Sequence, residues 1–179
     1  MAKKYKIGYT TGVYDMFHIG HLNLLRRAKE QCDYLIVGVS TDECVKTYKH
    51  KTPVIPFEDR KAIVEAIQYV DEVVPQENMD KFEAWQKRHF DVLFHGDDWK
   101  GSAMYNEIEA KLKAHGVEFV YFPYTKKISS TKLRETLQKG TTGIEETINS
   151  TETQEQKKQH RSLISRLTSR LAMSIKSLF

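Results

Sequence analysis

The segment that decides the fold reads YKIGYTTGVYDMFHIGHLNLLRRAKEQCDYLIVGVS and spans residues 5–40. Residues 5–10 are a short strand pattern. Residues 34–39 form a nearly continuous apolar run, which is typical of a strand buried on both faces of a parallel sheet. Between them, apolar residues recur at helical spacing from about residue 19 to residue 31. A strand, a helix and a second strand in this order predict two parallel strands joined by a right-handed crossover.

The same alternation continues along the chain. Further strand patterns lie at residues 72–74, 92–94 and 117–122, and helical patterns cover about residues 57–69, 80–88 and 104–115. We therefore predict an α/β fold, namely a doubly wound, Rossmann-like domain with a parallel five-stranded sheet. Ligands of such sheets bind at the carboxyl ends of the strands, so functional residues should lie in loops that directly follow a strand.

In the helix at 57–69, the residues expected to face the core are Ile63, Ala66, Ile67 and Val70.

The chain changes character after residue 138. Residues 139–156 are rich in Gly, Thr, Glu, Ser and Asn and read as a linker, whereas residues 157–179 read as a basic amphipathic helix. We predict a folded domain over residues 1–138, followed by these two segments as a C-terminal helical extension. The helix could lie on an anionic membrane surface, or its apolar stripe could pack on the domain or on a second subunit.

Composition places the protein among soluble globular chains. It has 179 residues, enough for one compact domain, and a formal net charge of +4. Residues 152–179 hold six Lys or Arg against two Glu, and this difference of +4 equals the excess of the whole chain, so the body is formally neutral and no nucleic acid partner is predicted. Cys32 and Cys44 are expected to be free thiols in a reducing compartment. The chain shows no secretory signal and no run of about 18 apolar residues, which predicts a cytoplasmic location.

The loop after the first strand pattern is suited to bind an anion. Gly12 allows a ligand to approach the backbone, and the helix that begins near Ile19 offers free N–H groups. His18 and His21 are three residues apart, so both can face one side of the first turn and stabilise charge on a phosphorus under attack. Other readings remain: a histidine that caps or packs, a His-x-x-His zinc pair, or an ordinary strand–turn–helix junction.

A second anion site is predicted further along. Ile128, Ser129, Ser130 and Thr131 directly precede a helical pattern over residues 132–138, so their hydroxyl and amide groups could form a second cradle that faces the first. The plain alternative is that one of the hydroxyl groups caps the helix.

These two segments carry a family resemblance. Residues 12–21 read Gly-Val-Tyr-Asp-Met-Phe-His-Ile-Gly-His, which resembles the Gly-Thr-Phe-Asp-x-x-His-x-Gly-His signature of the cytidylyltransferase family within the nucleotidyltransferase superfamily. The Ile-Ser-Ser-Thr segment resembles the second hallmark of that superfamily. The likeness covers about residues 5–138 and is greatest to the bacterial glycerol-3-phosphate cytidylyltransferases. It implies transfer of CMP from CTP to a small phosphorylated alcohol, Mg²⁺ bound mainly by the triphosphate rather than by side chains, and a homodimer.

The resemblance also implies roles for individual residues. The implied catalytic residues are His18, His21, Lys51, Arg60, Ser130 and Thr131. The implied nucleotide-binding residues are Thr10, Thr11, Gly12, Val13, Tyr14, Asp15, His21, Gly96, Asp97, Asp98, Trp99, Tyr124, Thr125, Ile128, Ser129, Ser130 and Thr131. The implied acceptor-binding residues are Asp15, Lys49, Lys51 and Arg60.

Several of these roles have alternatives. The phosphate-binding lysine lies in a basic loop predicted over residues 46–51, where the order of preference is Lys51, Lys49 and Lys46. Asp15 could assist a metal or fix its loop. Arg60 could instead form a surface salt bridge.

The chain departs from the family pattern at two places. Tyr124-Thr125-Lys126-Lys127 stands where the family has Arg-Thr-x-Gly, and Gln68 stands where an arginine is common. A tyrosine hydroxyl cannot replace a guanidinium at a phosphate, although Lys126 or Lys127 could. Glycerol 3-phosphate stays favoured as the acceptor, while phosphocholine, phosphoethanolamine and other polyol phosphates remain open. An ATP-using adenylyltransferase of the same fold and a nucleotide-sensing module without catalysis are the rival functions.

Overall fold

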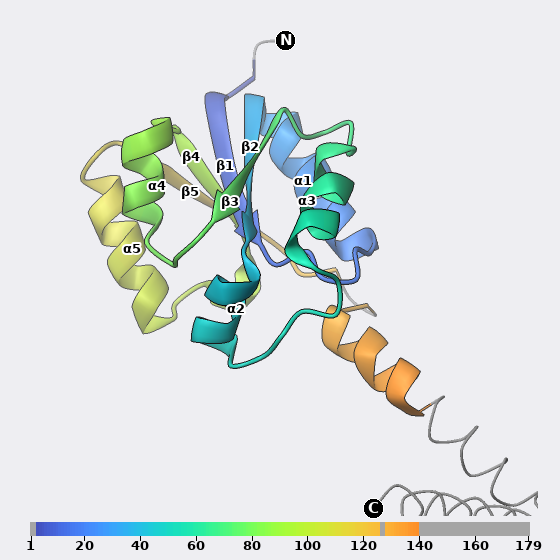
Figure 1. Ribbon diagram of the computed structural model, residues 1–179. Coiled ribbons are helices and arrows are strands. Elements are labelled where there is room, and N and C mark those ends of the chain that lie inside the picture. Colours follow the sequence, from blue (N-terminus) through green and yellow to red (C-terminus); the bar gives the residue numbers. More distant parts are fainter. Residues whose placement is uncertain (1–2, 126–127, 140–179) are drawn as a thin grey trace, which may run out of the picture. The chain divides into compact units, whose positions relative to one another are not determined.

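The computed structural model describes residues 3–125 and 128–139. Its centre is a five-stranded sheet in which all four pairs of neighbouring strands are parallel, in the order β3-β2-β1-β4-β5 (Figure 1). The strands are β1 (Tyr5–Gly12), β2 (Cys32–Ser40), β3 (Glu72–Gln76), β4 (Val92–Gly96) and β5 (Glu118–Phe122). The predicted α/β fold with five parallel strands is confirmed.

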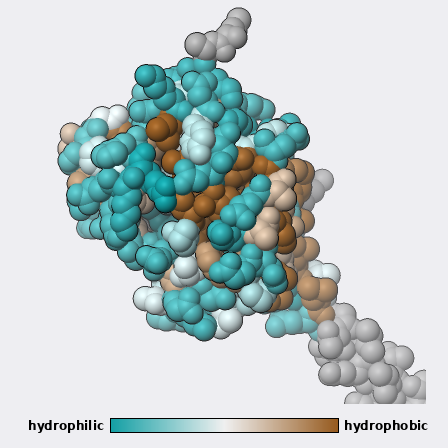
Figure 2. Space-filling model, turned by 45° about the horizontal axis from the view of Figure 1, so that its top comes forward, coloured by the Kyte–Doolittle hydropathy of each residue, from teal (hydrophilic) through white to brown (hydrophobic). Residues whose placement is uncertain are grey.

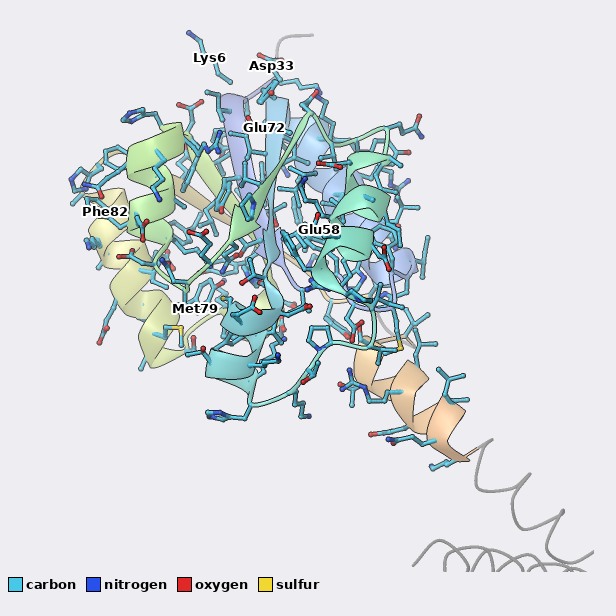
Figure 3. The ribbon with its side chains drawn as sticks, in the orientation of Figure 1. Lys6, Asp33, Glu58, Glu72, Met79 and Phe82 are labelled. Carbon is cyan, nitrogen blue, oxygen red and sulfur yellow. The ribbon has the colours of Figure 1, made fainter. Side chains whose placement is uncertain are left out.

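Helices cover both faces of this sheet. They are α1 (Ile19–Gln31), α2 (Asp42–Lys49), α3 (Phe57–Glu65), α4 (Lys81–Arg88) and α5 (Ala103–Lys113), with a short 3₁₀ helix η1 (Asp97–Trp99) after β4. Figure 3 shows Glu58 of α3 and Phe82 of α4 on opposite sides of the sheet. Alternate residues of β2 explain the two layers: Leu35 and Val37 pack with the cluster that contains α1 and α3, whereas Ile36 packs with the cluster that contains α4 and α5.

The predicted core stripe of the helix at 57–69 is wrong in part, at Ile63 and Ala66. The helix ends at Glu65, and the side chain of Ile63 is 43% exposed, whereas Arg60 and Val64 are buried. Ile67 and Val70 do pack against the core, but from the turn that follows the helix. The prediction differs from the structure because the helical pattern was continued past Glu65, where the helix ends.

The basic loop predicted over residues 46–51 is also wrong in part, because residues 42–49 form helix α2. The hydroxyl of Thr41 accepts a hydrogen bond from the Cys44 N–H at 3.1 Å and so caps the helix start. Acidic residues fill the first turn and basic residues the last, as the helix dipole favours. The helix ends at His50, whose φ of 51° lies in the left-handed region.

The position of β1 determines where a ligand can bind. Thr10 of β1 pairs with Val37 of β2 on one side and with Phe94 of β4 on the other. The chain moves outward from β1 through β2 to β3 and then returns to β4, so the strand order reverses between β1 and β4. A ligand site is expected at the carboxyl ends of these two strands. Figure 3 shows Met79 near that edge of the sheet, with Lys6 and Asp33 at the opposite end.

Some remaining expectations concern the whole chain. Cys32 and Cys44 are free thiols, as predicted, and both are buried. The chain divides into two units, residues 1–133 and residues 134–179, and of the second the structure describes residues 134–139, the end of a helix that begins at residue 130. The predicted linker at 139–156 lies outside the described residues except for Lys139, which is helical, and the basic helix predicted at 157–179 lies outside them altogether. Within the described part of the chain, no helix is long and apolar enough to span a membrane.

Candidate active site

The first feature of the site is the histidine loop, residues 12–21, which leads from β1 into α1. His18 is the N-cap of α1, and its Nδ1 accepts a hydrogen bond from the Gly20 N–H at 3.1 Å. The Nδ1 of His21 accepts from the His18 N–H at 3.4 Å. These reciprocal bonds stack the two imidazole rings with their centroids 3.9 Å apart and their planes at 19°. The capping alternative is therefore correct for His18, and it fixes the orientation of both rings.

The hydrogen bonds also determine what the histidines can offer a ligand. Because both Nδ1 atoms accept, the neutral ring of each histidine carries its proton on Nε2. Burial lowers the pKa of His18. Burial, reinforced by the neighbouring His18, lowers the pKa of His21 to about 3. At neutral pH the pair therefore presents two uncharged N–H donors.

The carboxylate of Asp15 holds the histidine loop in place. Asp15 is buried, and its oxygens accept from the N–H groups of Val54 at 3.0 Å and Ile55 at 2.9 Å. Tyr14, next in the chain, is also buried, and its ring packs 5.3 Å from that of His21. These contacts favour the loop-fixing alternative for Asp15, and they place Tyr14 behind His21 instead of at the surface where a nucleotide contact was predicted.

Arg60 lies beneath the loop instead of facing a phosphate. Its side chain is fully buried, and it donates to Asp42 Oδ1 at 2.6 Å, to the Ile55 carbonyl at 2.9 Å and to the Val13 carbonyl. In this structure the guanidinium is engaged within the protein, while the implied catalytic and acceptor-binding roles of Arg60 stay predictions. The alternative of a surface salt bridge is wrong, because the ion pair is an internal one.

The start of the helix over residues 130–139 reaches the same loop. The hydroxyl of Ser130 donates to the Asp15 carbonyl at 2.7 Å, which joins the two predicted anion cradles directly. The hydroxyl of Ser129 accepts from the Lys132 N–H at 3.1 Å and caps the helix. Thr131 is exposed on the first turn. Two of the three hydroxyl groups expected at a phosphate are thus engaged within the protein.

A cleft of about 310 Å³ opens at the carboxyl ends of the strands, where the fold predicts a ligand. Five of its lining residues were predicted to bind nucleotide or acceptor: Thr11, Gly12, Val13, Lys49 and Trp99. Thr10 is not among the lining residues, and its side chain is fully buried. Sequence reasoning missed the other lining residues, which are Ser40, Tyr48, Gln76, Met79, His95 and Tyr105.

Lys49 is the best placed of the three candidate lysines. It lines the cleft, and partial burial lowers the pKa of its ammonium group. Lys51 is exposed two residues beyond the end of α2, and Lys46 lies one turn earlier on that helix. The geometry therefore favours Lys49 over Lys51 and Lys46, the reverse of the first two places in the predicted order.

The loops after β4 and β5 are tied together on the other side of the site. Asp97 Oδ1 accepts from the Tyr124 N–H at 3.0 Å, and the Thr125 hydroxyl accepts from Asn23 of α1 at 3.4 Å. The hydroxyl of Tyr124, whose side chain is 51% exposed, donates to the Ile128 carbonyl at 3.4 Å. Lys126 and Lys127, which could have supplied the missing guanidinium charge, lie outside the described residues.

Asp98 is the second carboxylate of the loop after β4. Partial burial raises the pKa of its carboxyl group, while the positive charge of Lys49 acts in the opposite direction. A side chain at Gly96 would meet the Asp98 carboxylate at 2.5 Å, so this glycine permits the close approach. Residues 3–125 and 128–139 contain no group of three His, Cys, Asp or Glu side chains suited to hold a metal ion.

The sequence is similar to those of known nucleotidyltransferases. The cytidylyltransferase-like family model matches residues 9–136. Glycerol-3-phosphate cytidylyltransferase of Bacillus subtilis (strain 168) is 39% identical over 133 residues, which cover 70% of this chain and 92% of that protein. FAD synthase of Thermococcus sibiricus is 34% identical over 141 residues, covering 78% of this chain and 95% of that protein.

A solved structure has a similar fold. The lipopolysaccharide core biosynthesis protein from Thermoplasma volcanium GSS1 superimposes with a TM-score of 0.58 at 23% identity, covering 69% of this chain and 99% of that one. This likeness shows the fold alone.

Proposed function

The chain belongs to the cytidylyltransferase-like family, and from this premise we propose that it transfers the CMP group of CTP to a small phosphorylated alcohol and releases pyrophosphate. The observation that carries the proposal is the stacked pair His18 and His21, two neutral imidazoles whose Nδ1 atoms are occupied and whose Nε2–H groups remain for a ligand. Donors of this kind, held before the substrate arrives, suit a reaction in which negative charge grows on phosphate oxygens.

The reaction needs no covalent intermediate with the protein. An oxygen of the acceptor phosphate attacks the α-phosphorus of CTP, the bond from this phosphorus to the bridging oxygen breaks, and pyrophosphate leaves. We propose that His18 and His21 donate to the oxygens on which charge develops, while Lys49 binds the acceptor phosphate. Catalysis then rests on alignment of the two substrates and on neutralisation of charge.

The proposed reaction also uses Mg²⁺, which would enter the site together with the nucleotide. The described side chains do not form a metal site by themselves, and Asp15 is engaged with backbone N–H groups. We propose that Mg²⁺ binds mainly to the triphosphate and supplies charge neutralisation there.

Release of pyrophosphate tests the function directly. Each of CTP, ATP, GTP and UTP is combined with glycerol 3-phosphate, phosphocholine and phosphoethanolamine in turn, and pyrophosphate is measured. We expect turnover with CTP and one of these acceptors. Absence of turnover with every pair would refute the proposal, and turnover only with ATP would favour an adenylyltransferase. That second candidate is supported by the similarity to an FAD synthase, which extends over 78% of this chain.

Assembly and location are the last parts of the proposal. We propose a cytoplasmic homodimer, which light scattering of the purified chain tests. The basic segment at 157–179 has two readings, contact with an anionic membrane or packing on the protein. Sedimentation with anionic vesicles of the full chain and of residues 1–150 separates them, because only membrane contact makes the two behave differently.

A further inference from the structure

Three buried polar atoms lack hydrogen-bond partners where β3, α4 and β4 meet near the cleft. They are Gln76 Oε1 at the end of β3, Lys81 Nζ at the start of α4 and His95 Nδ1 in β4. We call these three residues the open cluster. Buried polar groups are normally paired, so three neighbouring exceptions next to a proposed active site indicate atoms that a ligand can satisfy.

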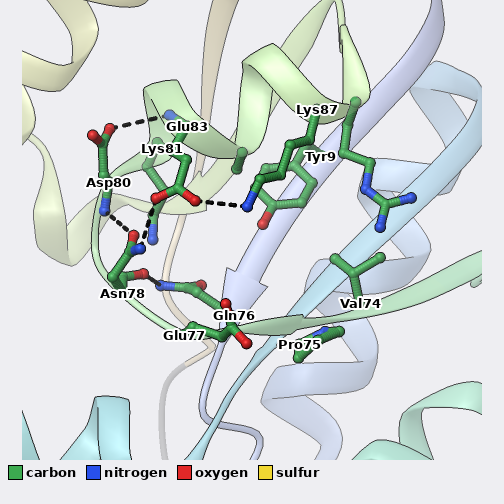
Figure 4. Close-up of a pocket in the computed structure, with 12 residues that line it drawn as sticks. Tyr9, Val74, Pro75, Gln76, Glu77, Asn78, Asp80, Lys81, Glu83 and Lys87 are labelled. Carbon is green, nitrogen blue, oxygen red and sulfur yellow. Dashed lines mark hydrogen bonds and ion pairs between the residues drawn. The ribbon is translucent and has the colours of Figure 1, made fainter.

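Lys81 is the most unusual member. Only 1% of the residue is exposed, and no group in the described part of the protein accepts from its ammonium. Burial lowers its pKa to about 8, while the neighbouring Cys44 and Asp80 act in the opposite direction, so the ammonium remains charged at neutral pH. An unpaired buried charge destabilises a fold, and an apolar side chain of the same length would be easier to accommodate. Lys87 of the same helix is an ordinary contrast, because it pairs with Glu83 at 2.6 Å (Figure 4).

The cluster joins two hollows. Gln76 and His95 line the cleft, and Gln76 and Lys81 also line an adjoining groove of about 630 Å³ between β3 and α4 (Figure 4). The hydrophobic residues on the face seen in Figure 2 gather in a central band surrounded by hydrophilic ones. Lys81 lies close enough to His95 to add to the effect of burial, which lowers the pKa of His95 to about 4. A ligand in the cleft can therefore extend past Gln76 toward the ammonium.

The orientation of Gln76 specifies what such a ligand must carry. Its Nε2 donates to the Asn78 carbonyl at 2.9 Å, so Oε1 is left as an acceptor without a donor. The Lys81 ammonium is a donor without an acceptor. A hydroxyl group can donate to the first and accept from the second, whereas a trimethylammonium can do neither.

We propose that the open cluster is the part of the acceptor site that recognises hydroxyl groups, so that the protein selects a phosphorylated polyol with an uncharged end over phosphocholine and phosphoethanolamine. This inference rests on the proposed function. The Lys81 ammonium repels a cationic end at short range. The His95 ring packs on Trp99 and Tyr105, with centroids 5.7 and 4.9 Å away, so these three rings of the cleft wall are engaged with one another.

The decisive variant is Lys81→Met. With CTP saturating, KM for glycerol 3-phosphate should rise by about 10- to 100-fold, the effect of losing one hydrogen bond to a charged group, while KM for CTP stays within about twofold. The preference for glycerol 3-phosphate over phosphoethanolamine should fall by a similar factor. The variant should melt at the same temperature as the wild type or higher. Lys113→Met, which removes an exposed lysine paired with Glu109 on α5, is the matched control and should change none of these values.

A second variant tests whether charge in the cluster decides the choice of acceptor, by adding a negative charge. Gln76→Glu places a carboxylate beside the Lys81 ammonium and should shift the preference toward phosphoethanolamine. If the wild type releases pyrophosphate but both variants keep its acceptor KM and preference, the inference fails while the proposed function stands. A wild type that prefers phosphoethanolamine or phosphocholine would also overturn the inference alone. If no acceptor supports turnover, both fail together.

Discussion

In the histidine loop, both inward-facing ring nitrogens accept a backbone N–H, the Asp15 carboxylate is bound by two amides, and Ser130 donates to the Asp15 carbonyl. In the open cluster, at the ends of β3 and β4 and the start of α4, three buried polar atoms have no partner among the described residues. The two regions lie at the same edge of one sheet. The contrast is one of degree, because the buried hydroxyls of Tyr14, within the histidine loop, and of Thr10, just before it, also have no hydrogen-bond partner among the described residues. Hydrogen bonds made within the protein fix the groups whose position matters for a reaction, and polar groups without a partner are available to a ligand.

The largest expected effect comes from breaking the internal support of the histidine loop. Arg60→Met should lower the free energy of unfolding by about 3 kcal/mol, because it leaves the partly buried Asp42 carboxylate and two carbonyl groups without their donor. Urea denaturation measures this loss. Arg88→Met removes an ion pair with Glu72 that is about one-third exposed, and it should cost less than about 1 kcal/mol. A stable Arg60→Met protein with a raised KM for CTP would restore the phosphate contact implied by the family.

The second largest effect is expected from removing the two histidines that the loop positions. His18→Ala and His21→Ala should each reduce kcat by about 10²–10³-fold, the usual result of losing one preorganised donor. Circular dichroism should stay near that of the wild type for both, while His18→Ala, which also removes the N-cap of α1, should lower the free energy of unfolding by about 1 kcal/mol. His89→Asn is a suitable control, because His89 lies at the end of α4 in a left-handed conformation that asparagine also accepts. Retention of most activity by either alanine variant would remove the two imidazoles from the mechanism.

The cost of the unpaired Lys81 ammonium should appear as a dependence of the free energy of unfolding on pH. The pKa of Lys81 falls from 10.5 to about 8 in the folded protein, which corresponds to about 3 kcal/mol of destabilisation while the group is charged. Between these pH values the unfolded chain binds more protons than the folded one, so the wild type gains stability as the pH rises. Lys81→Met should therefore be more stable than the wild type at pH 7, and the difference should shrink toward pH 10 in urea titrations. A difference that does not vary with pH would mean that the ammonium is paired in solution.

The smallest effect is expected from glycine substitutions at two residues with strained backbone conformations. Met16 in the histidine loop and His89 at the end of α4 both have φ of 48°. His89→Gly should raise the free energy of unfolding by up to about 1 kcal/mol and leave kcat unchanged. Met16→Gly relieves the same strain but loosens the loop, so kcat should fall. Equal kcat values for the two variants would show that the conformation at Met16 has no part in the site.

Much of the fold was predictable because the strands are continuous apolar runs. All five strands were placed within a few residues, and the position of the cleft followed from the rule that ligands bind at strand ends. Helix α2 was missed because its apolar face is short, although Thr41 followed by two acidic residues was a readable start signal.

The site was less predictable because hydrogen-bond partners depend on tertiary contacts. Nothing local to Arg60 indicates that its guanidinium meets Val13, which lies 47 residues away. Gln76 and His95 were predictable in principle, because each follows or ends a predicted strand pattern. They were missed because glutamine and a lone histidine carry no motif.

The central place of β1 has a consequence for how the chain is made. Of the five strands of this sheet it leaves the ribosome first, yet its second neighbour, β4, begins at Val92, about 80 residues later. Until then one edge of β1 has no parallel partner and can pair with other nascent chains. Biosynthesis therefore passes through an interval in which three of the five strands, β1, β2 and β3, have been made and the two that complete the ligand edge of β1 have not.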